Sequence, residues 1–422
     1  MNEPDSKPAG RAPLISADEA LARLLSAVVP TGRTETVPTP EAWGRVLARD
    51  IVSGVHVPPE DNSAMDGYAL CVADLAAGAG GVLPVSQRIA AGRPGQPLQP
   101  GTAARIFTGA QVPAGADAVV MQEHCEALAG EGLGSVRVNE LPAPGTAIRR
   151  QGEDVRRGHV VLRAGHRMDA AAIGLAATVG AATLEVAARP RVALFSTGDE
   201  LVMPGEPLPP GAIYNSNRFM LGALLRGQGC LVTDLGNVPD QLEATRAMLR
   251  EAAAGHDLIL SSGGVSVGEE DHLKPALAAE GRLDLWAIAI KPGKPLAFGA
   301  VRQPAGEGAQ TWFVGLPGNP VSSHVTFTLF VRPVLARLQG AEAAWPIGVP
   351  MRADFAWPRP DKRREFLRVR RNASGGLDLY ANQGSGVLTS LAWGDGLADL
   401  APGQAVQPGD MVRFLSLAEL AP

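Results

Sequence analysis

Strand-like apolar runs alternate with helix-like segments from about residue 188 to residue 340, and this alternation limits the possible folds more than any other feature. Strands that alternate with helices are typical of a mainly parallel sheet covered by helices on both faces. We therefore predict a three-layer α/β domain for this region. The expected strands are the apolar runs at residues 191–197, 257–260, 283–290 and 310–316.

Polar residues beside the expected helices indicate where those helices begin. Asp240 forms a capping-box pattern with the glutamate three residues later. Asp271 directly precedes another helical segment, so we expect it to cap that helix. Asn319 and Pro320 are typical of the N-cap and the first position of a last helix, which Pro333 should kink.

The chain of 422 residues is longer than one hydrophobic core usually organises, so we expect several domains. A capped amphipathic helix at residues 16–29 is expected to pack with the later segment 145–187, in which Asp169 opens a second helix. Elsewhere, short apolar runs alternate with turns, as in small β-rich units. The predicted organisation is a disordered tail (1–13), a helix-containing linker domain (14–57 with 145–187), an inserted β-rich domain (58–144), the α/β domain (188–340) and a small C-terminal β domain (345–422).

Composition excludes several classes of function. A net charge of −5 gives no reason to expect nucleic acid or an anionic membrane as a partner. The three cysteines are scattered and form no CxxC pair, so we expect neither a disulfide framework nor a thiolate zinc site. The most apolar stretch, residues 170–184, is too short and too rich in small residues to span a membrane. The N-terminal residues are polar and contain no apolar signal region, and we expect a cytoplasmic protein.

Three polar loops that contain glycine follow expected strands of the α/β region, at residues 196–201, 261–271 and 315–320. Ligands of open parallel sheets bind beyond the carboxyl ends of the strands. Glycines let the backbone approach a ligand closely, and backbone N–H groups suit an anion. The first two loops also carry acids, which suits a divalent cation that bridges them to a phosphate. These acids are Asp199, Glu200, Glu269, Glu270 and Asp271.

A fourth segment, KPGKP at residues 291–295, holds Lys291 and Lys294 in a turn that contains two prolines. Two fixed lysines can bind an oxyanion. Each of these features also has an ordinary structural explanation: the lysines could lie on an exposed turn, the acids could be solvated, and GLPGNP (315–320) could be a plain turn. The position of several polar loops at one edge of the predicted sheet favours a binding site.

Most familiar catalytic motifs are absent from the sequence. No GxxxxGK[ST] or GxGxxG pattern is present, so neither a P-loop triphosphatase nor a dinucleotide enzyme is indicated. The histidines show no HxxxH or HExxH spacing, so a catalytic metal bound by histidines is not expected. The segment GVSVG (264–268) resembles a serine hydrolase elbow, but no acid–histidine partner is evident.

Three polar positions outside the α/β region also stand out. Asp66 lies in a turn within DNSAMDGYAL, and Thr108 follows an expected strand in RIFTG. Asp154 lies with a glutamate among four arginines in RRQGEDVRRG. The residues alone favour an ordinary explanation for this last group, a cluster of paired and solvated charges.

Taken together, these motifs resemble one family, the molybdopterin molybdenumtransferases of the MoeA and gephyrin E-domain type. The resemblance follows the family's order over about residues 14–340, and it continues more weakly through RREFLRV and NQGSG in the last domain. The matching segments are DNSAMDGYA, RIFTGAQVPAGADAVVMQE, GEDV, RPRVALFSTGDELV, GAIYNSN, SSGGVSVGEEDHLK, IKPGKPLAFG and GLPGNPVSSHVTF.

The resemblance implies an enzyme that inserts molybdate into adenylylated molybdopterin, releases AMP and forms molybdenum cofactor with the help of Mg2+. It implies four domains and an elongated homodimer, with each site between the α/β domain of one subunit and the β domains of the other. The implied protein partners are the enzyme that adenylylates molybdopterin and the molybdoenzymes that receive the cofactor.

The resemblance also assigns site residues. The implied catalytic acids are Asp66, Asp154, Glu200, Asp240 and Asp271, and the last three of these are the implied metal ligands. The backbone of Gly263 and Gly264 is expected to approach the phosphate of the pterin. The other implied substrate-binding residues are Thr108, Lys291, Lys294, Pro295, Pro317, Pro320, Arg363 and Ser385, with Arg364 and Ser390 as alternatives to the last two.

Two other functions stay open on the sequence alone. A pyrophosphatase acting on another nucleotide-linked substrate would need only the acidic loop and Mg2+, and it would leave Lys291, Lys294 and Arg363 without a role. A dimeric scaffold that binds proteins would not need acids in these loops. Molybdate-dependent release of AMP separates the three functions.

Overall fold

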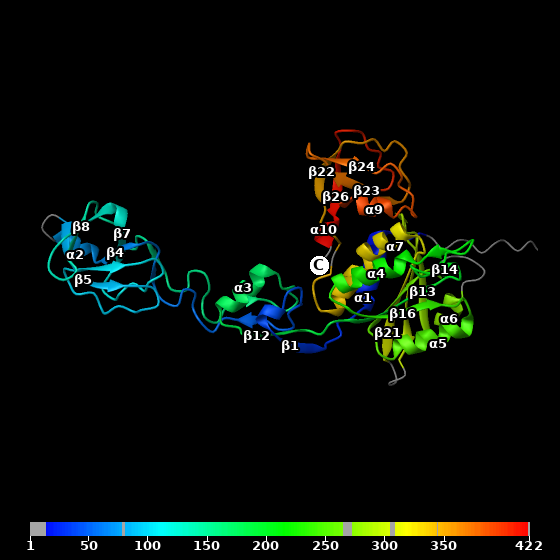
Figure 1. Cartoon of the computed structure of the whole chain (residues 1–422), viewed down its shortest axis with the longest axis horizontal. Helices are drawn as coiled ribbons and strands as arrows, with labels where there is room; N and C mark the ends of the chain where they lie inside the picture. The colour runs from blue at the N-terminus through cyan, green and yellow to red at the C-terminus, as the bar shows by residue number, and fades with distance from the viewer. Residues whose placement is uncertain (1–13, 78–80, 265–271, 304–308, 344, 421–422) are drawn as a thin grey trace, which may run out of the picture.

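The structure of the protein is a computed structural model that describes residues 14–77, 81–264, 272–303, 309–343 and 345–420. The molecule is elongated (Figure 1). A small β-rich part lies at one end, a helix-containing connection follows, and the α/β part lies at the other end beside the C-terminal strands. No helix within these described residues is long and apolar enough to cross a membrane.

The α/β part is built on a six-stranded sheet with the order β16-β13-β17-β21-β20-β18. The first four strands are parallel, and β20 and β18 form an antiparallel edge. The prediction of a mainly parallel sheet is therefore confirmed. The strands are β16 (Leu231–Val238), β13 (Arg191–Thr197), β17 (Leu258–Ser262), β21 (Gln310–Leu316), β20 (Pro295–Arg302) and β18 (Gly281–Ala287).

Both faces of this sheet are buried because its central strands carry apolar residues at consecutive positions. In β13, Val192 and Leu194 belong to one core whereas Ala193 and Phe195 belong to the other, as the two-residue period of a strand requires. The first core contains α1 (Ala17–Ala27), α4 (Ser216–Gly227), α7 (Pro320–Thr326) and α8 (Arg332–Leu338), and the second contains α5 (Leu242–Ala253) and α6 (Leu273–Glu280).

Two of the six strands, β16 and β20, are not among the strands expected from apolar runs. Strand β16 lies at an edge and is mostly exposed, so selection for burial does not give it an apolar run. Strand β20 is almost wholly buried, but it begins at Pro295, inside the segment interpreted as a lysine turn. The apolar pattern therefore predicts the parallel centre of the sheet better than its remaining strands.

Helix starts agree with the expected caps at two positions and disagree at Asp240. Ser16 and Asp169 each accept a hydrogen bond from the backbone N–H three residues later, at 3.1 and 2.8 Å. Helix α5, in contrast, has Gln241 at its N-cap position and no side-chain cap. The expected cap is wrong because the helix begins one residue later than predicted, so Asp240 precedes the N-cap position. The Asp240 backbone N–H donates to Asp199 Oδ1 at 3.4 Å, which joins this turn to a neighbouring loop.

The last helix of the α/β part begins as expected, with Asn319 at the N-cap position and Pro320 in the first turn. Its hydrogen bonds become π-helical over η4 (Phe327–Val331), directly before α8. Pro333 has no backbone N–H, so a regular helical hydrogen bond is missing there. A wider helical turn therefore lies directly before the helix that contains Pro333, where the sequence predicted a kink.

The two segments that flank the β-rich part pack together and share a small core. Helix α1 lies elsewhere, because Leu21 and Leu24 are buried among residues of the α/β part, where α1 contacts α8. The expected packing of this helix with residues 145–187 is therefore wrong. The shared core is formed by β1 (Thr34–Pro38) paired with β12 (Thr183–Ala187), β2 (Ile51–Val52) paired with β11 (Val160–Leu162), the short helix η1 (Thr39–Glu41) and α3 (Ala170–Thr178).

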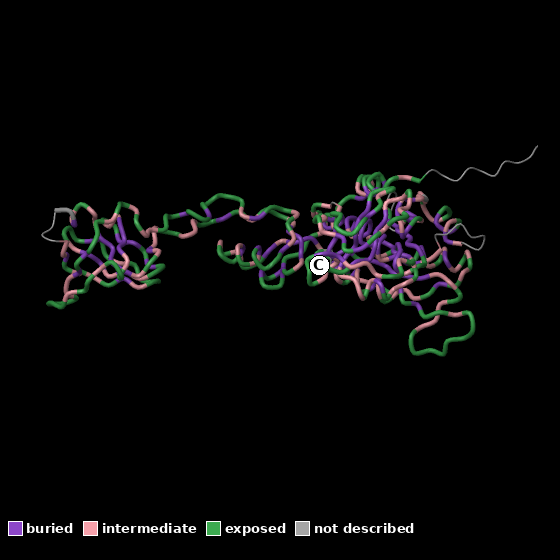
Figure 2. The backbone as a smooth tube through the Cα atoms, turned by 90° about the horizontal axis from the view of Figure 1, so that it is seen from above, coloured by how far each residue is buried: buried purple, intermediate pink, exposed green. Residues whose placement is uncertain are grey.

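The β-rich part is joined to the rest of the molecule by two largely exposed chain segments that run side by side (Figure 2). Strands β3 (Asn62–Ser63) and β10 (Ile148–Arg149) pair where these segments reach the β-rich part. The sheet itself has the order β7-β4-β6-β5-β9-β8. The elements of the β-rich part are β4 (Gly67–Leu70), α2 (Val72–Ala77), β5 (Val82–Ile89), β6 (Ala103–Ile106), β7 (Ala118–Met121), η3 (Gln122–His124), β8 (Cys125–Leu128) and β9 (Ser135–Val138).

The C-terminal part forms a ring of five strands, here called the C-terminal barrel, because β25 pairs with both β26 and β23. Strand β19 (Ile290–Lys291) of the α/β part pairs in parallel with β23, and Lys291 lies opposite Glu365. This pairing joins the KPGKP segment to the barrel. The barrel elements are β22 (Val349–Ala353), β23 (Arg364–Arg371), β24 (Gly376–Leu379), α9 (Thr389–Trp393), β25 (Gly396–Leu400), β26 (Met411–Ser416) and α10 (Leu417–Leu420).

Candidate functional site

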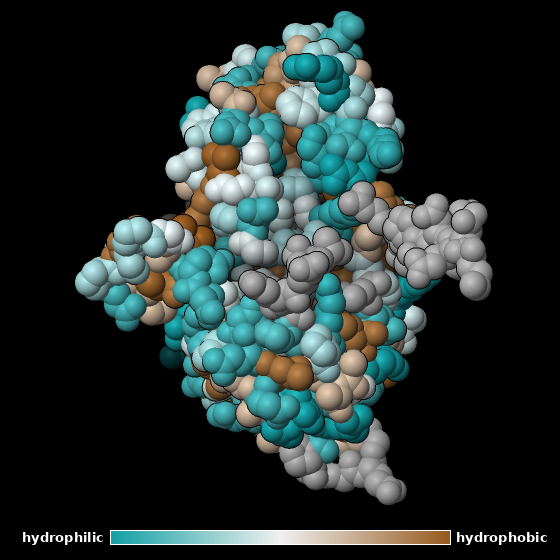
Figure 3. All heavy atoms as spheres, turned by 90° about the vertical axis from the view of Figure 1, so that its right-hand side faces the viewer, coloured by the Kyte–Doolittle hydropathy of each residue, from teal (hydrophilic) through white to brown (hydrophobic). Residues whose placement is uncertain are grey.

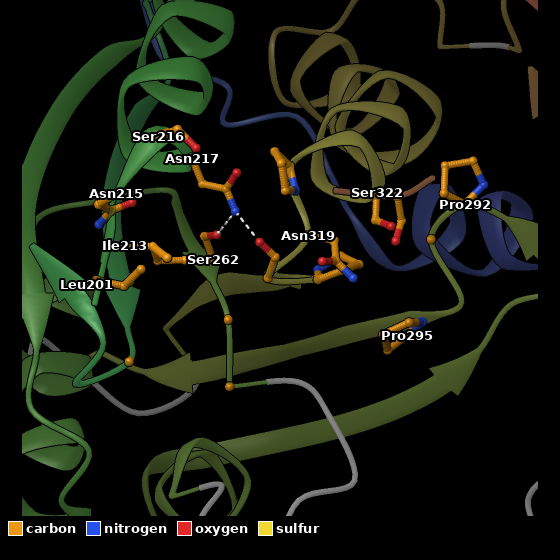
Figure 4. A pocket seen from close by; sticks show the side chains of 18 of the residues that line it. Leu201, Ile213, Asn215, Ser216, Asn217, Ser262, Pro292, Pro295, Asn319 and Ser322 are labelled. Carbon is orange, nitrogen blue, oxygen red and sulfur yellow. Dashed lines mark hydrogen bonds between the residues drawn. The ribbon is translucent and has the colours of Figure 1, made fainter. Parts of the chain in front are cut away.

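A cavity of about 850 Å³ lies at the carboxyl edge of the α/β sheet and extends to the C-terminal barrel. Loops that follow β13, β17 and β21 line it, together with the KPGKP segment and barrel residues 363 and 383–385. Figure 4 shows part of its wall, and Figure 3 shows that hydrophilic side chains prevail on this end of the molecule. The cavity therefore lies where open parallel sheets bind their ligands.

Most of the candidate residues of the α/β region and the barrel line this one cavity. They come from seven separate segments of the chain, five in the α/β part and two in the C-terminal barrel. Asp271 lies outside the described residues. The candidates that line the cavity are Glu200, Asp240, Gly263, Gly264, Lys291, Lys294, Pro295, Pro317, Pro320, Arg363 and Ser385.

Three candidates, Asp66, Thr108 and Asp154, do not line the cavity. Asp66 and Thr108 nevertheless meet in the β-rich part, where Asp66 Oδ1 accepts hydrogen bonds from the backbone N–H and the hydroxyl of Thr108, both at 2.8 Å. These bonds, first the one from the backbone, lower the pKa of the Asp66 carboxyl. Asp154 is exposed at the end of the connection, where its N–H donates to Val57 O at 3.1 Å.

The loop after β17 needs glycine for its close approach to the loop after β13. Gly263 and Gly264 have φ angles of +91° and +66°. A Cβ on Gly263 would lie 2.8 Å from Thr197 O, and one on Gly264 would lie 2.9 Å from Thr197 Oγ1. Side chains at these two positions would push the two loops apart.

Gly263→Ala is accordingly expected to lower the free energy of unfolding by about 2 kcal/mol, because it adds a strained φ angle and a backbone clash. Gly255→Ala is the matched control, since Gly255 has no positive φ angle and no heavy atom within 4 Å of the added Cβ. Urea unfolding of both variants measures the difference. Equal stability of the two variants would contradict the assigned loop geometry.

Three cations line the cavity, and we call Lys291, Lys294 and Arg363 the cationic cluster. Lys291 Nζ lies 3.1 Å from Glu365 Oε1 and 3.6 Å from Asp361 Oδ2. Arg363 forms a two-bond contact with Asp361, from Nε at 3.0 Å and Nη2 at 2.8 Å. This contact raises the pKa of Arg363 and holds the pKa of the Asp361 carboxyl well below its usual range.

Lys294 differs from the other two cations of the cluster. Its side chain is exposed, and it forms no ion pair with any residue that the structure describes. Its backbone carbonyl accepts a hydrogen bond from Ile288 N–H at 2.8 Å, so the chain is held while the ammonium group stays available. A cluster with two fixed cations and one unpaired cation can bind an oxyanion of two negative charges.

The structure separates the alternatives that sequence reasoning left open. Arg364 pairs with Asp399 through two bonds of 2.7 Å and lines a different cavity. Ser390 is buried, and its hydroxyl accepts a hydrogen bond from Arg368 Nε at 3.1 Å. Arg363 and Ser385 are therefore the members of these two pairs that line the candidate site.

Asn217 is a cavity residue that sequence reasoning did not single out. Its side-chain amide donates to Ser262 Oγ at 2.8 Å and to Gly318 O at 2.7 Å (Figure 4). It lies in the first turn of α4, and Asn215 caps that helix by accepting a bond from Arg218 N–H at 3.1 Å. The asparagines of the GAIYNSN segment were the available signal, since they stand directly before a helix. Asn217 thus links the start of α4 to two cavity loops.

His324, on α7, is expected to make the stability of the α/β part depend on pH. Burial lowers its pKa from the usual 6.5 to about 4, and its Nδ1 has no hydrogen-bond partner among the residues that the structure describes. Between these two pH values the unfolded chain binds more protons than the folded chain, so stability is full above pH 6.5 and falls as the pH drops towards 4.

Between pH 7 and pH 5 we expect His324 to remove about 2 kcal/mol of unfolding free energy. Urea unfolding at both pH values measures this loss, and His324→Gln should remove most of it. His159→Gln is the control, because His159 is exposed. An unchanged pH dependence in His324→Gln would mean that folding does not lower the pKa of this histidine.

Family models match three consecutive stretches of the chain. Residues 15–180 match the MoeA N-terminal region (domain I and II), residues 193–337 match a probable molybdopterin binding domain, and residues 350–417 match the MoeA C-terminal region (domain IV). Together these stretches include the cavity, the connection and all of the candidate residues.

Individual relatives agree with the family models. A molybdopterin molybdenumtransferase of Haemophilus influenzae is 43% identical over 328 residues, which cover 78% of each chain. Molybdopterin molybdenumtransferase 2 of Mycobacterium tuberculosis is 38% identical over 409 residues, covering 94% of this chain and 96% of that protein. The crystal structure of molybdopterin biosynthesis moeA protein from Pyrococcus horikoshii OT3 has a TM-score of 0.78 at 29% identity and covers 96% of this chain and 100% of its own. The chain therefore belongs to the molybdopterin molybdenumtransferase family.

Proposed function

We propose that this protein inserts molybdate into adenylylated molybdopterin, releases AMP and thereby forms molybdenum cofactor. One observation carries the proposal: three kinds of group line a single cavity. They are the cationic cluster, two glycines whose lack of a side chain lets the backbone pass close to Thr197, and the carboxylates Glu200 and Asp240. The cations suit a tetrahedral dianion, the glycine backbone suits a phosphate group, and the carboxylates suit a metal ion bound to a phosphoanhydride.

The cationic cluster is the proposed molybdate site. Lys291, Lys294 and Arg363 supply N–H donors to the cavity, which Ser385 and Pro295 also line. Charge-assisted hydrogen bonds of this kind are stronger than neutral ones and fix the position of an oxyanion. The protein thereby holds molybdate beside the pterin, and proximity and charge neutralisation replace covalent catalysis.

The carboxylates of Glu200 and Asp240 fit the Mg2+ that the family resemblance implies. Within the described part of the chain, no three or more His, Cys, Asp or Glu side chains lie close enough together to hold a metal ion. This suits Mg2+, which is commonly held by one or two carboxylates together with substrate phosphates and water. The ion, when bound, would neutralise charge on the phosphoanhydride. Asp271 is the third proposed ligand.

The proposed active form is a homodimer. The β-rich part, which holds Asp66 and Thr108, lies at the far end of the elongated molecule from the α/β part (Figure 1), and Asp154 lies in the connection. None of the three residues lines the cavity. A second copy of the chain would bring these three residues to the cavity without a rearrangement of the subunit. We propose that the β-rich part of one subunit supplies them to the cavity of the other.

The remaining proposals concern the cellular setting. We propose that the protein acts in the cytoplasm, receives its substrate from the enzyme that adenylylates molybdopterin and passes the product to molybdoenzymes. These proposals rest on the family resemblance.

The test is release of AMP from adenylylated molybdopterin by the purified full chain with Mg2+, measured with and without molybdate. We expect release that needs molybdate and a product that activates a molybdoenzyme lacking its cofactor. AMP release that does not depend on molybdate would indicate a pyrophosphatase. A folded protein that releases no AMP would support the scaffold function instead.

A further inference from the structure

Glu365 is a buried carboxylate at the junction between the α/β part and the C-terminal barrel. It lies on β23 directly opposite Lys291 of β19, and its side chain is only 1% exposed. A buried carboxylate is strongly destabilising unless it is paired and hydrogen-bonded. The groups that surround Glu365 must therefore compensate its charge.

Three donors surround this carboxylate. Oε1 lies 3.1 Å from Lys291 Nζ, and Oε2 accepts hydrogen bonds from Trp357 Nε1 at 2.9 Å and from the Asp361 N–H at 2.7 Å. Lys291 is the only cation among these three donors. Its side chain is 42% exposed and lines the cavity, in contrast to the buried side chain of Glu365. The ammonium group thus faces Glu365 on one side and keeps further N–H donors for a ligand.

Asp361 acts in the same way on the neighbouring cation. Its two oxygens accept both bonds from Arg363, and it also lies 3.6 Å from Lys291 Nζ. Arg363 Nη1 additionally lies 3.4 Å from Ile290 O, so the guanidinium is held against strand β19. Two barrel carboxylates thereby hold two of the three members of the cationic cluster.

We propose that Glu365 and Asp361 are positioning residues that fix Lys291 and Arg363 for binding of a tetrahedral oxyanion such as molybdate. This inference rests on the function proposed above and extends it to residues that do not touch the substrate. Lysine and arginine side chains lose considerable rotamer freedom when they bind a ligand. Fixing them in the free protein removes that cost from the binding step, and the C-terminal barrel thereby becomes part of the molybdate site.

Equilibrium dialysis of molybdate against the purified full chain tests this inference. Glu365→Gln keeps the size and two hydrogen bonds of the side chain but loses the charge that faces Lys291. We expect it to weaken molybdate binding about tenfold, the effect of one charge-assisted contact. Asp399→Asn is the matched control, because Asp399 is a buried barrel carboxylate that pairs with Arg364 outside the cavity.

A double-mutant cycle separates positioning from general stability. In a Lys291→Ala background, Glu365→Gln should cause no further loss of molybdate binding, because its effect passes through that lysine. Steady-state kinetics should show a higher KM for molybdate with the KM for adenylylated molybdopterin within about twofold of wild type. Should Glu365→Gln not fold, Asp361→Asn tests the same inference through Arg363.

The outcomes distinguish the inference from the function on which it rests. Wild-type protein that binds no molybdate would overturn the proposed function. Wild-type binding that Glu365→Gln and Asp361→Asn leave unchanged, or that Asp399→Asn weakens equally, would overturn the positioning role alone. Selective loss in the two positioning variants supports it.

Discussion

Lys294→Ala is expected to lower molybdate-dependent AMP release by about 100-fold or more, which is the usual cost of removing one donor to a developing or bound oxyanion. Lys294 is the member of the cationic cluster without an ion pair among the described residues, so its charge is available to the substrate. Its removal should raise the KM for molybdate and leave the fold intact. Steady-state release of AMP over a range of molybdate concentrations measures the effect.

Lys362→Ala is the control for this variant. Lys362 is an exposed lysine beside Arg363 that does not line the cavity, so its loss should change neither turnover nor the KM for molybdate. Lys291→Ala gives a second comparison, because it leaves the buried Glu365 without its cation and should lower stability as well as activity. Wild-type turnover in Lys294→Ala would remove this lysine from the molybdate site.

The second large effect is expected for Asp240→Asn. The Asp240 carboxylate lines the cavity together with Glu200, and its backbone is tied to the loop of Asp199. An amide keeps the shape but loses the negative charge that favours Mg2+. We expect turnover to fall about 100-fold, because charge stabilisation by a metal contributes several kcal/mol. Chelation of divalent cations in the wild-type protein should cause a loss of similar size.

The Mg2+ dependence distinguishes a metal ligand from a structural acid. In Asp240→Asn, the Mg2+ concentration needed for half-maximal turnover should rise, whereas Glu251→Gln on the exposed side of α5 should behave like wild type. A lower turnover with an unchanged Mg2+ requirement would assign Asp240 to substrate positioning instead.

Local patterns predict the centre of this fold well. Strands β13 and β21 begin and end at the predicted residues, because central strands of a parallel sheet are apolar on both faces and stand out from the polar loops around them. The polar loops themselves were also predictable as a group, since successive parallel strands end at the same edge. Glycines in those loops satisfy positive φ angles that can be anticipated from residue type.

Long-range partners explain what the sequence did not reveal. Glu365 and Asp361 become important only because β19 pairs with β23 across more than seventy positions of the chain. The backbone of Asp240 likewise bonds to Asp199, which lies 41 positions earlier in the chain. Edge strand β16 has no apolar run because one side of it faces solvent. Each of these features depends on a partner that local periodicity does not encode.

The most direct measurement follows AMP and inserted molybdenum in the same reaction of wild-type protein with adenylylated molybdopterin and Mg2+. We expect one AMP released for each molybdenum inserted and no release above background without molybdate. AMP that accumulates without molybdate, or in large excess over inserted molybdenum, would contradict the proposal that the cavity couples cleavage of the phosphoanhydride to molybdate insertion.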